Sequence, residues 1–432
     1  MRRTTIRTAT RPALVFADAD GNVLEAPEFG AAMRCGADLV PIDPADLVPL
    51  PEGSTLYALP GRTAVAITSR GLEPIAGHGA VAAFPPSGWS IFGLAAYAKA
   101  PGAPMLPLYA YAAVCWWKGR LCIPAARVER DPKHDPAQFD EGALPAAVAT
   151  LRQRHPDNRL VTHLGENCAL RYGCANAKNL FLGRWECPVP LAPSCNAACV
   201  GCISAQPDAP IPSPQDRLAF VPEVAEVLEF ALPHLESAPR AMLSFGQGCE
   251  GEPLLQAERI EEVIRAIRAQ TPRGTLHLNT NGSRPDAVAR LCDAGLDSIR
   301  VSTNTARAKP YRLYYRPLTY AFRDVVKTLR VAKERGCFTS INYLAFPGFT
   351  DAVEEVDALE GLIAATKLDM IQWRNLNLDP EVYVELLGLK PGAERLGMRP
   401  LLARLERRFP KLRHGYVNPP RERFRRKARS GR

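Results

Sequence analysis

The sequence lacks long apolar runs: none approaches the ~20 residues that a membrane-spanning helix needs. Its first residues are basic, but the apolar stretch that follows covers only residues 13–17, which is too short for the core of a signal peptide. We therefore expect a cytoplasmic protein without a membrane segment. In a reducing compartment, the twelve cysteines are expected to be metal ligands, catalytic thiols or small buried residues rather than disulfides.

Net positive charge is small outside one segment. The formal net charge is +9, and residues 421–432 carry seven basic residues and one glutamate, which is +6 of that total. A basic tail of this kind can bind RNA phosphates or an acidic partner, or it can be a solvated terminus. No platform of aromatic and basic residues accompanies it, so nucleic-acid binding stays an alternative that is not favoured.

Internal repeats and low-complexity segments are also missing, and 432 residues exceed what one hydrophobic core usually serves. Residues 12–29, 53–67 and 108–129 each resemble a β-hairpin, with Asp-Gly-Asn, Pro-Gly and Lys-Gly as the expected turns. They predict a small β-rich N-terminal domain over residues 1–145. A linker that contains cysteines is expected over residues 146–183.

From residue 184 onward, short β-like runs alternate with amphipathic stretches, a pattern typical of a parallel sheet covered by helices. The expected strands lie near 184–190 and at 241–246, 275–280, 298–304, 338–346 and 370–378. The fold class is therefore α/β, a partial (β/α)6 TIM-like barrel over residues 184–385, with a flat doubly wound sheet as the alternative. A helical segment (386–420) and the basic tail (421–432) are expected to follow.

The stretch "SCNAACVGC" places Cys195, Cys199 and Cys202 on a loop after the first of these strands. A structural zinc ion usually has four protein ligands, and a cubane [4Fe–4S] cluster normally has four thiolates. Three thiolates leave one iron of a cubane open, where a chelating ligand can bind.

A Cys-x3-Cys-x2-Cys loop that opens a β/α barrel resembles the radical S-adenosylmethionine superfamily. The resemblance implies a [4Fe–4S] cluster on Cys195, Cys199 and Cys202, with S-adenosylmethionine on the open iron. In that superfamily, an electron from the reduced cluster cleaves the sulfonium bond, and a 5′-deoxyadenosyl radical abstracts a substrate hydrogen. The implied partner is an external one-electron donor of the flavodoxin or ferredoxin type.

Polar residues at the ends of later strands extend the resemblance. Gly251-Glu252-Pro253 is similar to the family motif that holds the amino group of S-adenosylmethionine, which needs a permissive backbone beside a carboxylate. Glu250 stands where a second glycine is common, so the acid that meets the ammonium group stays open. In similar enzymes, such strand ends contact the ribose and carboxylate; alternatively, these residues only cap strands. They are Asn279, Asn281, Ser302, Asn304 and Asn342.

Further polar residues and cysteines are weaker candidates. Gln372, Arg374 and Asn377 make the last strand too polar for a fully buried one, so we expect them to face the substrate. The cysteines that precede the loop are either ligands of an auxiliary cluster or zinc, with His163, or packed thiols; they are Cys168, Cys174 and Cys187. Cys249 is either a radical relay or methyl carrier, or a small loop residue.

The favoured hypothesis is a radical enzyme that abstracts hydrogen from a peptide or small molecule, with the N-terminal domain as recognition module. One alternative is a radical RNA-modifying enzyme. Another, from a different class, is a non-catalytic iron–sulfur or zinc module for electron transfer or nucleic-acid binding. The segment "KPYRLYYRPLTY" (309–320) either covers the substrate or packs in the core.

Overall fold

The computed structural model describes residues 11–207 and 211–424, which form two compact units that are each discontinuous in sequence. Unit 1 contains residues 11–129, 344–357 and 373–410, and unit 2 contains residues 130–343, 358–372 and 411–424. The predicted basic tail lies outside the described residues from position 425 onward. Within the described ranges, no helix is long and apolar enough to cross a membrane.

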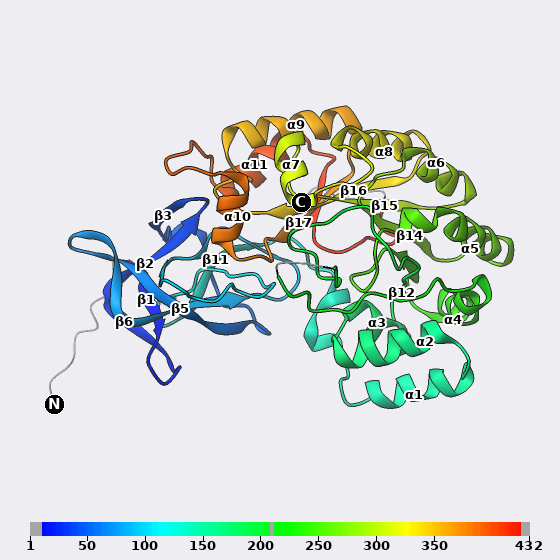
Figure 1. Ribbon diagram of the computed structural model, residues 1–432, viewed down its shortest axis with the longest axis horizontal. Coiled ribbons are helices and arrows are strands. Elements are labelled where there is room, and N and C mark those ends of the chain that lie inside the picture. The colour runs from blue at the N-terminus through cyan, green and yellow to red at the C-terminus, as the bar shows by residue number, and fades with distance from the viewer. Residues whose placement is uncertain (1–10, 208–210, 425–432) are drawn as a thin grey trace, which may run out of the picture. The chain divides into compact units, whose positions relative to one another are not determined.

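Unit 1 is built on an eleven-stranded sheet, so its β-rich character is as predicted (Figure 1). Strand β10 (Cys115–Trp117) turns into β11 (Arg120–Arg127) through Lys118 and Gly119, whose φ angles of 50° and 79° suit a tight hairpin turn. The other strands are β1 (Ala13–Ala17), β2 (Val23–Cys35), β3 (Asp38–Pro41), β4 (Leu47–Pro49), β5 (Thr55–Thr68), β6 (Gly71–Phe84), β7 (Trp89–Ile91), β8 (Leu94–Ala95) and β9 (Tyr97–Lys99).

The hairpin turn predicted at Pro60-Gly61 was wrong. The chain continues through these residues as the single strand β5, which pairs with β6, and the register shifts between Ala58 and Thr63. Gly61 has a φ of +66°, and a Cβ there would lie 2.6 Å from the Cβ of Ala103. Pro-Gly therefore marks an irregularity within a long strand, a role that glycine also plays at β-bulges.

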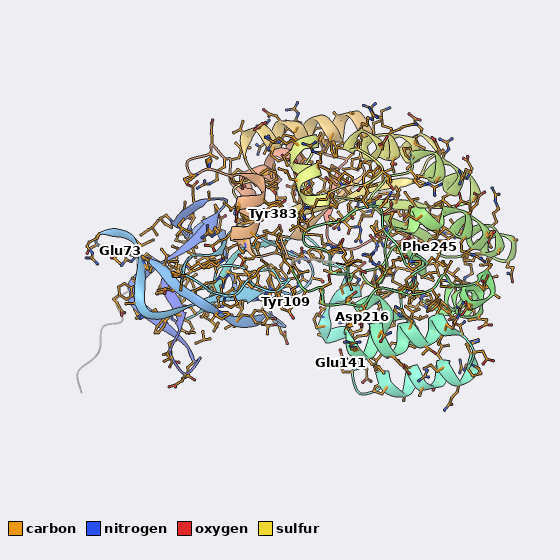
Figure 2. The ribbon with its side chains drawn as sticks, in the orientation of Figure 1. Glu73, Tyr109, Glu141, Asp216, Phe245 and Tyr383 are labelled. Carbon is orange, nitrogen blue, oxygen red and sulfur yellow. The ribbon has the colours of Figure 1, made fainter. Side chains whose placement is uncertain are left out.

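The C-terminal part of unit 1 is anchored by a buried ion pair. Arg62 of β5 lies 2.8 Å from Asp379, and neither side chain is exposed. Asp379 also accepts from the backbone of Glu381 and so caps α10 (Pro380–Leu387), in which Tyr383 is fully buried (Figure 2). The remaining helix of this part is α11 (Met398–Arg408). Removal of one partner of such a buried pair typically costs about 3–5 kcal/mol.

Unit 2 contains the predicted β/α barrel. The seven-stranded sheet has the order β12-β13-β14-β15-β16-β17-β18, in which β12 to β16 pair in parallel, as do β17 and β18. The strands are β12 (Glu186–Val189), β13 (Met242–Phe245), β14 (Thr275–Thr280), β15 (Ser298–Thr303), β16 (Phe338–Ala345), β17 (Met370–Asn375) and β18 (Arg413–Gly415). The α/β partial-barrel class is confirmed, with one short strand more than expected.

Amphipathic helices connect these strands. In α5 (Ala257–Gln270), the buried Ile260, Val263, Ile264 and Ile267 repeat at helical spacing and form one apolar face. Successive helices α4, α5, α6 and α8 lie next to one another outside the strands (Figure 1). The other helices between strands are α4 (Val224–Ser237), α6 (Pro285–Ala294), α7 (Ala308–Tyr315), α8 (Phe322–Glu334) and α9 (Val353–Thr366).

The segment expected to be a linker is largely helical. It contains α1 (Leu144–Arg154), α2 (Arg159–Thr162), a π-helix η4 (His163–Arg171) and α3 (Ala175–Phe181). Their buried side chains include Leu144 and Val148, so these turns pack in unit 2 rather than run as a solvated connection.

Polar side chains fill the interior of the barrel. Glu186 of β12 lies 3.1 Å from Lys133 and accepts from the hydroxyl of Ser244. Burial alone would raise the pKa of Glu186, but Lys133 and the Ser244 hydrogen bond hold that pKa well below its usual range. Further along, Arg300 of β15 donates to Gln372 of β17 at 3.0 Å. This interior is therefore a paired polar network rather than an apolar core.

His277 of β14 makes the barrel sensitive to acid. It is fully buried between Ser298, 2.7 Å from Nδ1, and the Asn279 carbonyl oxygen, 2.9 Å from Nε2. Burial, with Arg300 as a second cause, lowers the pKa of His277 from 6.5 to about 3. Because the folded pKa lies below the unfolded one, this contribution to stability is complete above pH 6.5 and is lost as the pH falls toward 3.

We predict that the unfolding temperature of the protein falls more steeply between pH 6.5 and 4.5 than that of His277→Gln. The expected difference arises because the unfolded state binds a proton at His277 that the folded state does not, which lowers the free energy of unfolding by up to about 1.4 kcal/mol per pH unit. Calorimetry of both proteins over this range measures it. Parallel pH profiles would contradict the prediction.

Candidate functional site

The cysteine loop follows β12 and pairs with the backbone of Gly251 and Glu252. The amide of Gly251 donates to the Ala192 carbonyl at 2.6 Å, and the amide of Glu252 donates to the Ser194 carbonyl at 2.9 Å. A Cβ on Gly251 would lie 1.9 Å from the Ser194 oxygen. Glycine is therefore required here by close backbone contact, and this contact sets the position of Cys195 relative to Glu252.

The other side of the loop rests on the end of α7 and the residues after it. Val200 donates to the Tyr314 carbonyl at 3.0 Å, and Leu318 donates to the Asn196 carbonyl at 2.9 Å. A Cβ on Gly201 would meet the Tyr314 hydroxyl at 2.8 Å. The tyrosines of this segment, Tyr311, Tyr314 and Tyr315, are buried, so the segment packs beside the cysteine loop; its role in covering the substrate stays a prediction.

The three cysteines open onto one cavity of about 230 Å³ in unit 2. The predicted residues that line it are Cys195, Cys199, Cys202, Gly251, Glu252, Pro253, Asn279, Asn281 and Ser302. Tyr315, from the aromatic segment 309–320, lines it as well. Arg217 and Gln247 also line it and were not predicted, and Arg217 lies in a segment without a recognisable motif. Residues from six separate stretches of the chain therefore meet near the carboxyl ends of the strands, where barrel enzymes hold ligands.

The thiols of the loop fit a cluster with one open iron. Burial raises the pKa of Cys195 to about 11 and also raises the pKa values of Cys199 and Cys202. Binding of a metal must therefore displace protons from these thiols. Among the described residues that line this cavity, the cysteines are the three predicted from the sequence, and no fourth cysteine is present.

Backbone amides of the chain itself form hydrogen bonds with the Glu250 carboxylate. This carboxylate accepts from the backbone amides of Leu191 at 2.8 Å, Ala192 at 2.9 Å and Gln247 at 2.6 Å. Burial raises the pKa of Glu250 to about 8 despite these donors. At the position where the related motif often has glycine, this chain thus has a carboxylate that holds the start of the cysteine loop.

Glu252 is the acid beside the thiols. It accepts from the backbone amides of Leu254 at 3.0 Å and Asn281 at 2.8 Å, and from the hydroxyl of Thr280. Burial raises the pKa of Glu252 to about 7. Its negative charge is also one of the causes that raise the pKa of Cys195, and both residues line the same cavity.

The two asparagines at the end of β14 position the surrounding loops. Asn279 donates to the carbonyls of Phe245 at 3.1 Å and Gly246 at 2.8 Å. Asn281 donates to the side chain of Asn196 at 2.8 Å, and so connects this strand end to the cysteine loop. Both amides are thereby fixed at the wall of the cavity.

The predicted residues on β15 and β16 are placed differently. Ser302 lies directly opposite Asn342 in the register of the two strands, so both face the same side of the sheet. Among the described residues, no hydrogen-bond partner reaches the buried Oδ1 of Asn342. Asn342 and the fully buried Asn304 are not among the residues that line the cavity.

The three residues expected to face the substrate are not among those that line the cavity. Gln372 is fully buried in the barrel interior, where it donates to Asn418 at 2.9 Å. Arg374 and Asn377 fall in unit 1. Their role in substrate binding stays a prediction.

The cysteines before the loop are also separated. Cys187 is fully buried in β12, Cys174 is half-buried, and the thiol of Cys168 lies 3.4 Å from that of Cys249. Within the described ranges, the group close enough to share one metal ion is His163, Cys168 and Cys249. Sequence spacing could not identify this group, because Cys249 lies 81 residues after Cys168.

We predict that Gly251→Ala abolishes assembly of the cysteine site. The new methyl group must push Ser194 away, which separates the cysteine loop from Glu252. Iron bound after anaerobic reconstitution measures the effect. The control is Gly361→Ala on the exposed face of α9, where an added Cβ meets nothing within 4 Å. Equal iron in the two variants would contradict the prediction.

Comparison with known proteins agrees with the motif. Residues 189–359 match the family model described as the Radical SAM superfamily. The FeMo cofactor biosynthesis protein NifB of Klebsiella pneumoniae is 28% identical over 236 residues, 49% of this chain and 44% of that protein. The GTP 3′,8-cyclase of Mycobacterium marinum is 32% identical over 151 residues, 34% of this chain and 38% of that protein. The chain thus spans less than half the length of these curated relatives.

A solved structure of Streptococcus suis SuiB bound to S-adenosylmethionine is 14% identical, with a TM-score of 0.36, and covers 63% of this chain and 62% of that chain. Because this TM-score is low, the fold is assigned from the order and direction of the strands in the chain's own sheet and not from this similarity. The segment matched by the family model contains the cysteine loop, Gly251, Glu252 and the strand ends that line the cavity. Residues 189–359 therefore form a radical SAM domain.

Proposed function

We propose that the chain holds a [4Fe–4S] cluster on Cys195, Cys199 and Cys202, binds S-adenosylmethionine beside it, and uses both to start a radical reaction. The observation that carries the proposal is the convergence of three thiols and the Glu252 carboxylate on one cavity. The backbone contact across Gly251 fixes their relative position. When bound, the cluster and S-adenosylmethionine supply reductive cleavage of the sulfonium bond and a 5′-deoxyadenosyl radical for hydrogen abstraction.

Glu252 is the residue proposed to receive the ammonium group of S-adenosylmethionine. Three donors from two segments orient its carboxylate at the cavity wall. Because burial raises its pKa to about 7, a cationic ligand would favour the ionised form and bind with charge-assisted hydrogen bonds. Glu250 is fully engaged by the backbone of the loop, so it is assigned a positioning role.

Ser302 and the basic residues of the cavity are proposed to orient the rest of the ligand. Ser302 lines the cavity beside Arg300, and Arg217 borders it near Cys202. A hydroxyl suits the ribose, and the guanidinium groups suit the carboxylate. Asn304, directly after β15, and Asn342, on β16, remain candidates.

The substrate is proposed to be a small molecule or peptide, with the β-rich unit 1 as the recognition module. The curated relatives are named after a metallocofactor and after GTP, and these names support a small molecule as the substrate. An external electron donor of the flavodoxin or ferredoxin type is needed to reduce the cluster. RNA modification through the basic tail stays the alternative within the superfamily.

The proposal predicts that the reconstituted protein forms 5′-deoxyadenosine from S-adenosylmethionine and dithionite under anaerobic conditions. Cys199→Ala should abolish the product because it removes one of the three thiolates. Cys292→Ser, a half-buried thiol on α6, is the matched control and should leave the product unchanged. A non-catalytic metal module would bind iron but form no product, and that result, or product from Cys199→Ala, would contradict the proposal.

Glu252→Gln should retain about as much iron as the unmodified chain but bind S-adenosylmethionine about 10- to 100-fold more weakly. The estimate is the loss of a charge-assisted hydrogen bond of about 1.5–3 kcal/mol. In the unmodified protein, binding should also weaken as the pH falls through about 7, because the carboxyl becomes protonated. In the variant this pH dependence should disappear.

Equilibrium dialysis between pH 6 and 8.5 measures both effects. The control is Glu262→Gln, whose side chain is 60% exposed in an ion pair with Arg259. An unchanged affinity in Glu252→Gln would exclude this residue as the ammonium ligand.

A further inference from the structure

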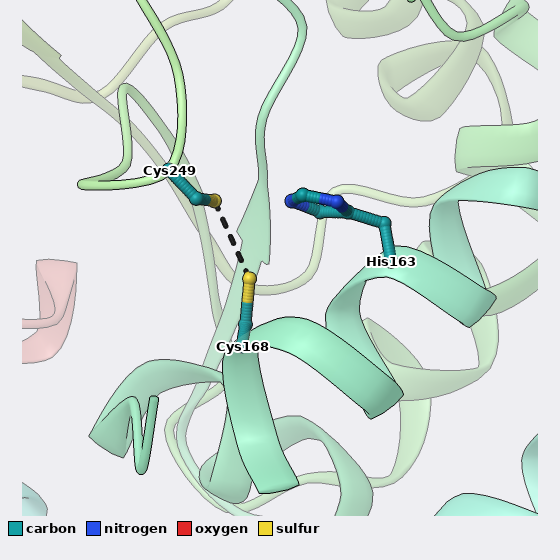
Figure 3. A group of neighbouring side chains, drawn as sticks. All are labelled: His163, Cys168 and Cys249. Atoms are coloured by element: carbon teal, nitrogen blue, oxygen red, sulfur yellow. Dashed lines mark hydrogen bonds between the residues drawn. The ribbon is translucent and has the colours of Figure 1, made fainter. Parts of the chain in front are cut away.

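A second group of metal-binding side chains lies in unit 2, and none of them lines the cavity of the cysteine loop. The ligand atoms of His163, Cys168 and Cys249 all lie within 4.8 Å of one another. Figure 3 shows the imidazole ring of His163 directed toward the two thiols. His163 and Cys168 come from η4, and Cys249 comes from the loop after β13, so an ion here would connect two distant segments.

The π-helical turn explains how His163 and Cys168 face the same point. In an α-helix, residues five apart are rotated by about 140° from one another and point apart. In a π-helix, hydrogen bonds run from i to i+5, which brings such residues nearly above each other. Residues 163–171 adopt this rare form, as short π-helical turns at functional sites often do.

His163 carries a free ligand atom aimed at the thiols. The residue is only 8% exposed, and among the described residues nothing hydrogen-bonds its buried Nε2. Its Nδ1 lies 3.3 Å from the side-chain amide of Asn167. The atom of Asn167 that faces Nδ1 is the amide nitrogen Nδ2. A 180° flip of this amide would bring its carbonyl oxygen to Nδ1–H and select the tautomer in which Nε2 can bind a metal, as partners of metal-bound histidines commonly do.

The distances fit a single ion better than the alternatives. The two sulfurs are 3.4 Å apart, compared with about 2.05 Å in a disulfide and about 3.8 Å for two sulfurs bound 2.3 Å from a tetrahedral ion. Thiolates that bind different irons of a cubane stand farther apart than two thiolates on one ion. Zinc binds two thiolates and one imidazole readily, and its fourth coordination position is then open to another ligand.

We propose that His163, Cys168 and Cys249 bind one zinc ion, which fixes η4 to the loop that carries Glu250, Gly251 and Glu252. Two thiolates neutralise the charge of the ion, so the buried site carries no net charge. The C-terminal end of η4 is held by a second contact, since Tyr172 donates to Asp216 at 2.7 Å. Zinc is thus proposed as a structural support of the ligand-binding loop, independent of the radical chemistry.

The test uses the protein with its cluster already assembled, so that the cysteine loop cannot bind zinc. Zinc, iron and acid-labile sulfide are measured after addition of one equivalent of zinc and removal of the excess. About one zinc and about four irons per chain are expected. X-ray absorption at the zinc edge should show two sulfurs at about 2.3 Å and nitrogen or oxygen at about 2.0 Å. This measurement needs no variant.

Variants then identify the ligands. Cys168→Ser and Cys249→Ser should lose zinc, and His163→Ala should bind it at least about tenfold more weakly, while all three keep about four irons. Asn167→Leu should weaken zinc binding about 10- to 100-fold, because the imidazole loses its orienting partner. The matched control is Cys292→Ser, which removes one thiol of the Cys292–Cys337 pair, 3.1 Å apart, and should keep zinc.

Several results would overturn the proposal. They are an absence of bound zinc, a zinc edge with three or more sulfurs, and zinc that survives in Cys168→Ser and Cys249→Ser. If the unmodified protein holds about eight irons per chain and these variants hold about four, the site binds a second iron–sulfur cluster instead of zinc. Loss of 5′-deoxyadenosine formation with zinc still bound would count against the proposed function and not against this site.

Discussion

The contact between the backbone of residues 250–252 and that of residues 191–194 is the constraint on which the site depends. Four hydrogen bonds cross it, two to the Glu250 carboxylate and two between main chains. Gly251 allows the approach because any side chain there would overlap Ser194. As a result, the cysteine loop and Glu252 cannot move independently, and the three thiols face the same cavity as the carboxylate.

Glu250 shows how a departure from a familiar motif can be accommodated. A carboxylate at this position would be costly if it were left unpaired in a buried loop, since burial raises its pKa to about 8. Three backbone amides donate hydrogen bonds to this carboxylate, and two of them belong to the start of the cysteine loop, which Glu250 therefore holds in place. Glu252, three residues after Cys249, is left as the acid that faces the thiols. The loop thus separates a positioning carboxylate from the proposed ligand-binding carboxylate.

Much of unit 2 was predictable because its signals are local. The central strands are short, buried runs bounded by amphipathic helices. The cysteine spacing predicts a three-thiolate site when it is taken together with the motifs at the later strand ends. β18 (Arg413–Gly415) escaped prediction because three residues carry no periodicity. Pro60-Gly61 was misread because the same residue pair serves both turns and bulges. Neither error affected the site.

The parts that were not predictable depend on tertiary contacts. The His163–Cys168–Cys249 group combines a π-helical register with a residue 81 positions away, and neither can be read from spacing. Arg217 reaches the cavity from a loop without a motif. The interior position of Gln372 depends on Arg300 and Asn418, which approach from distant strands and loops.

Electron paramagnetic resonance of the reduced, cluster-loaded protein tests most directly whether S-adenosylmethionine binds at the open iron beside Glu252. Addition of S-adenosylmethionine is expected to change the spectrum of the reduced cluster, because a new ligand then coordinates one of its irons. An identical spectrum at saturating S-adenosylmethionine, with about four irons per chain, would contradict the proposed site.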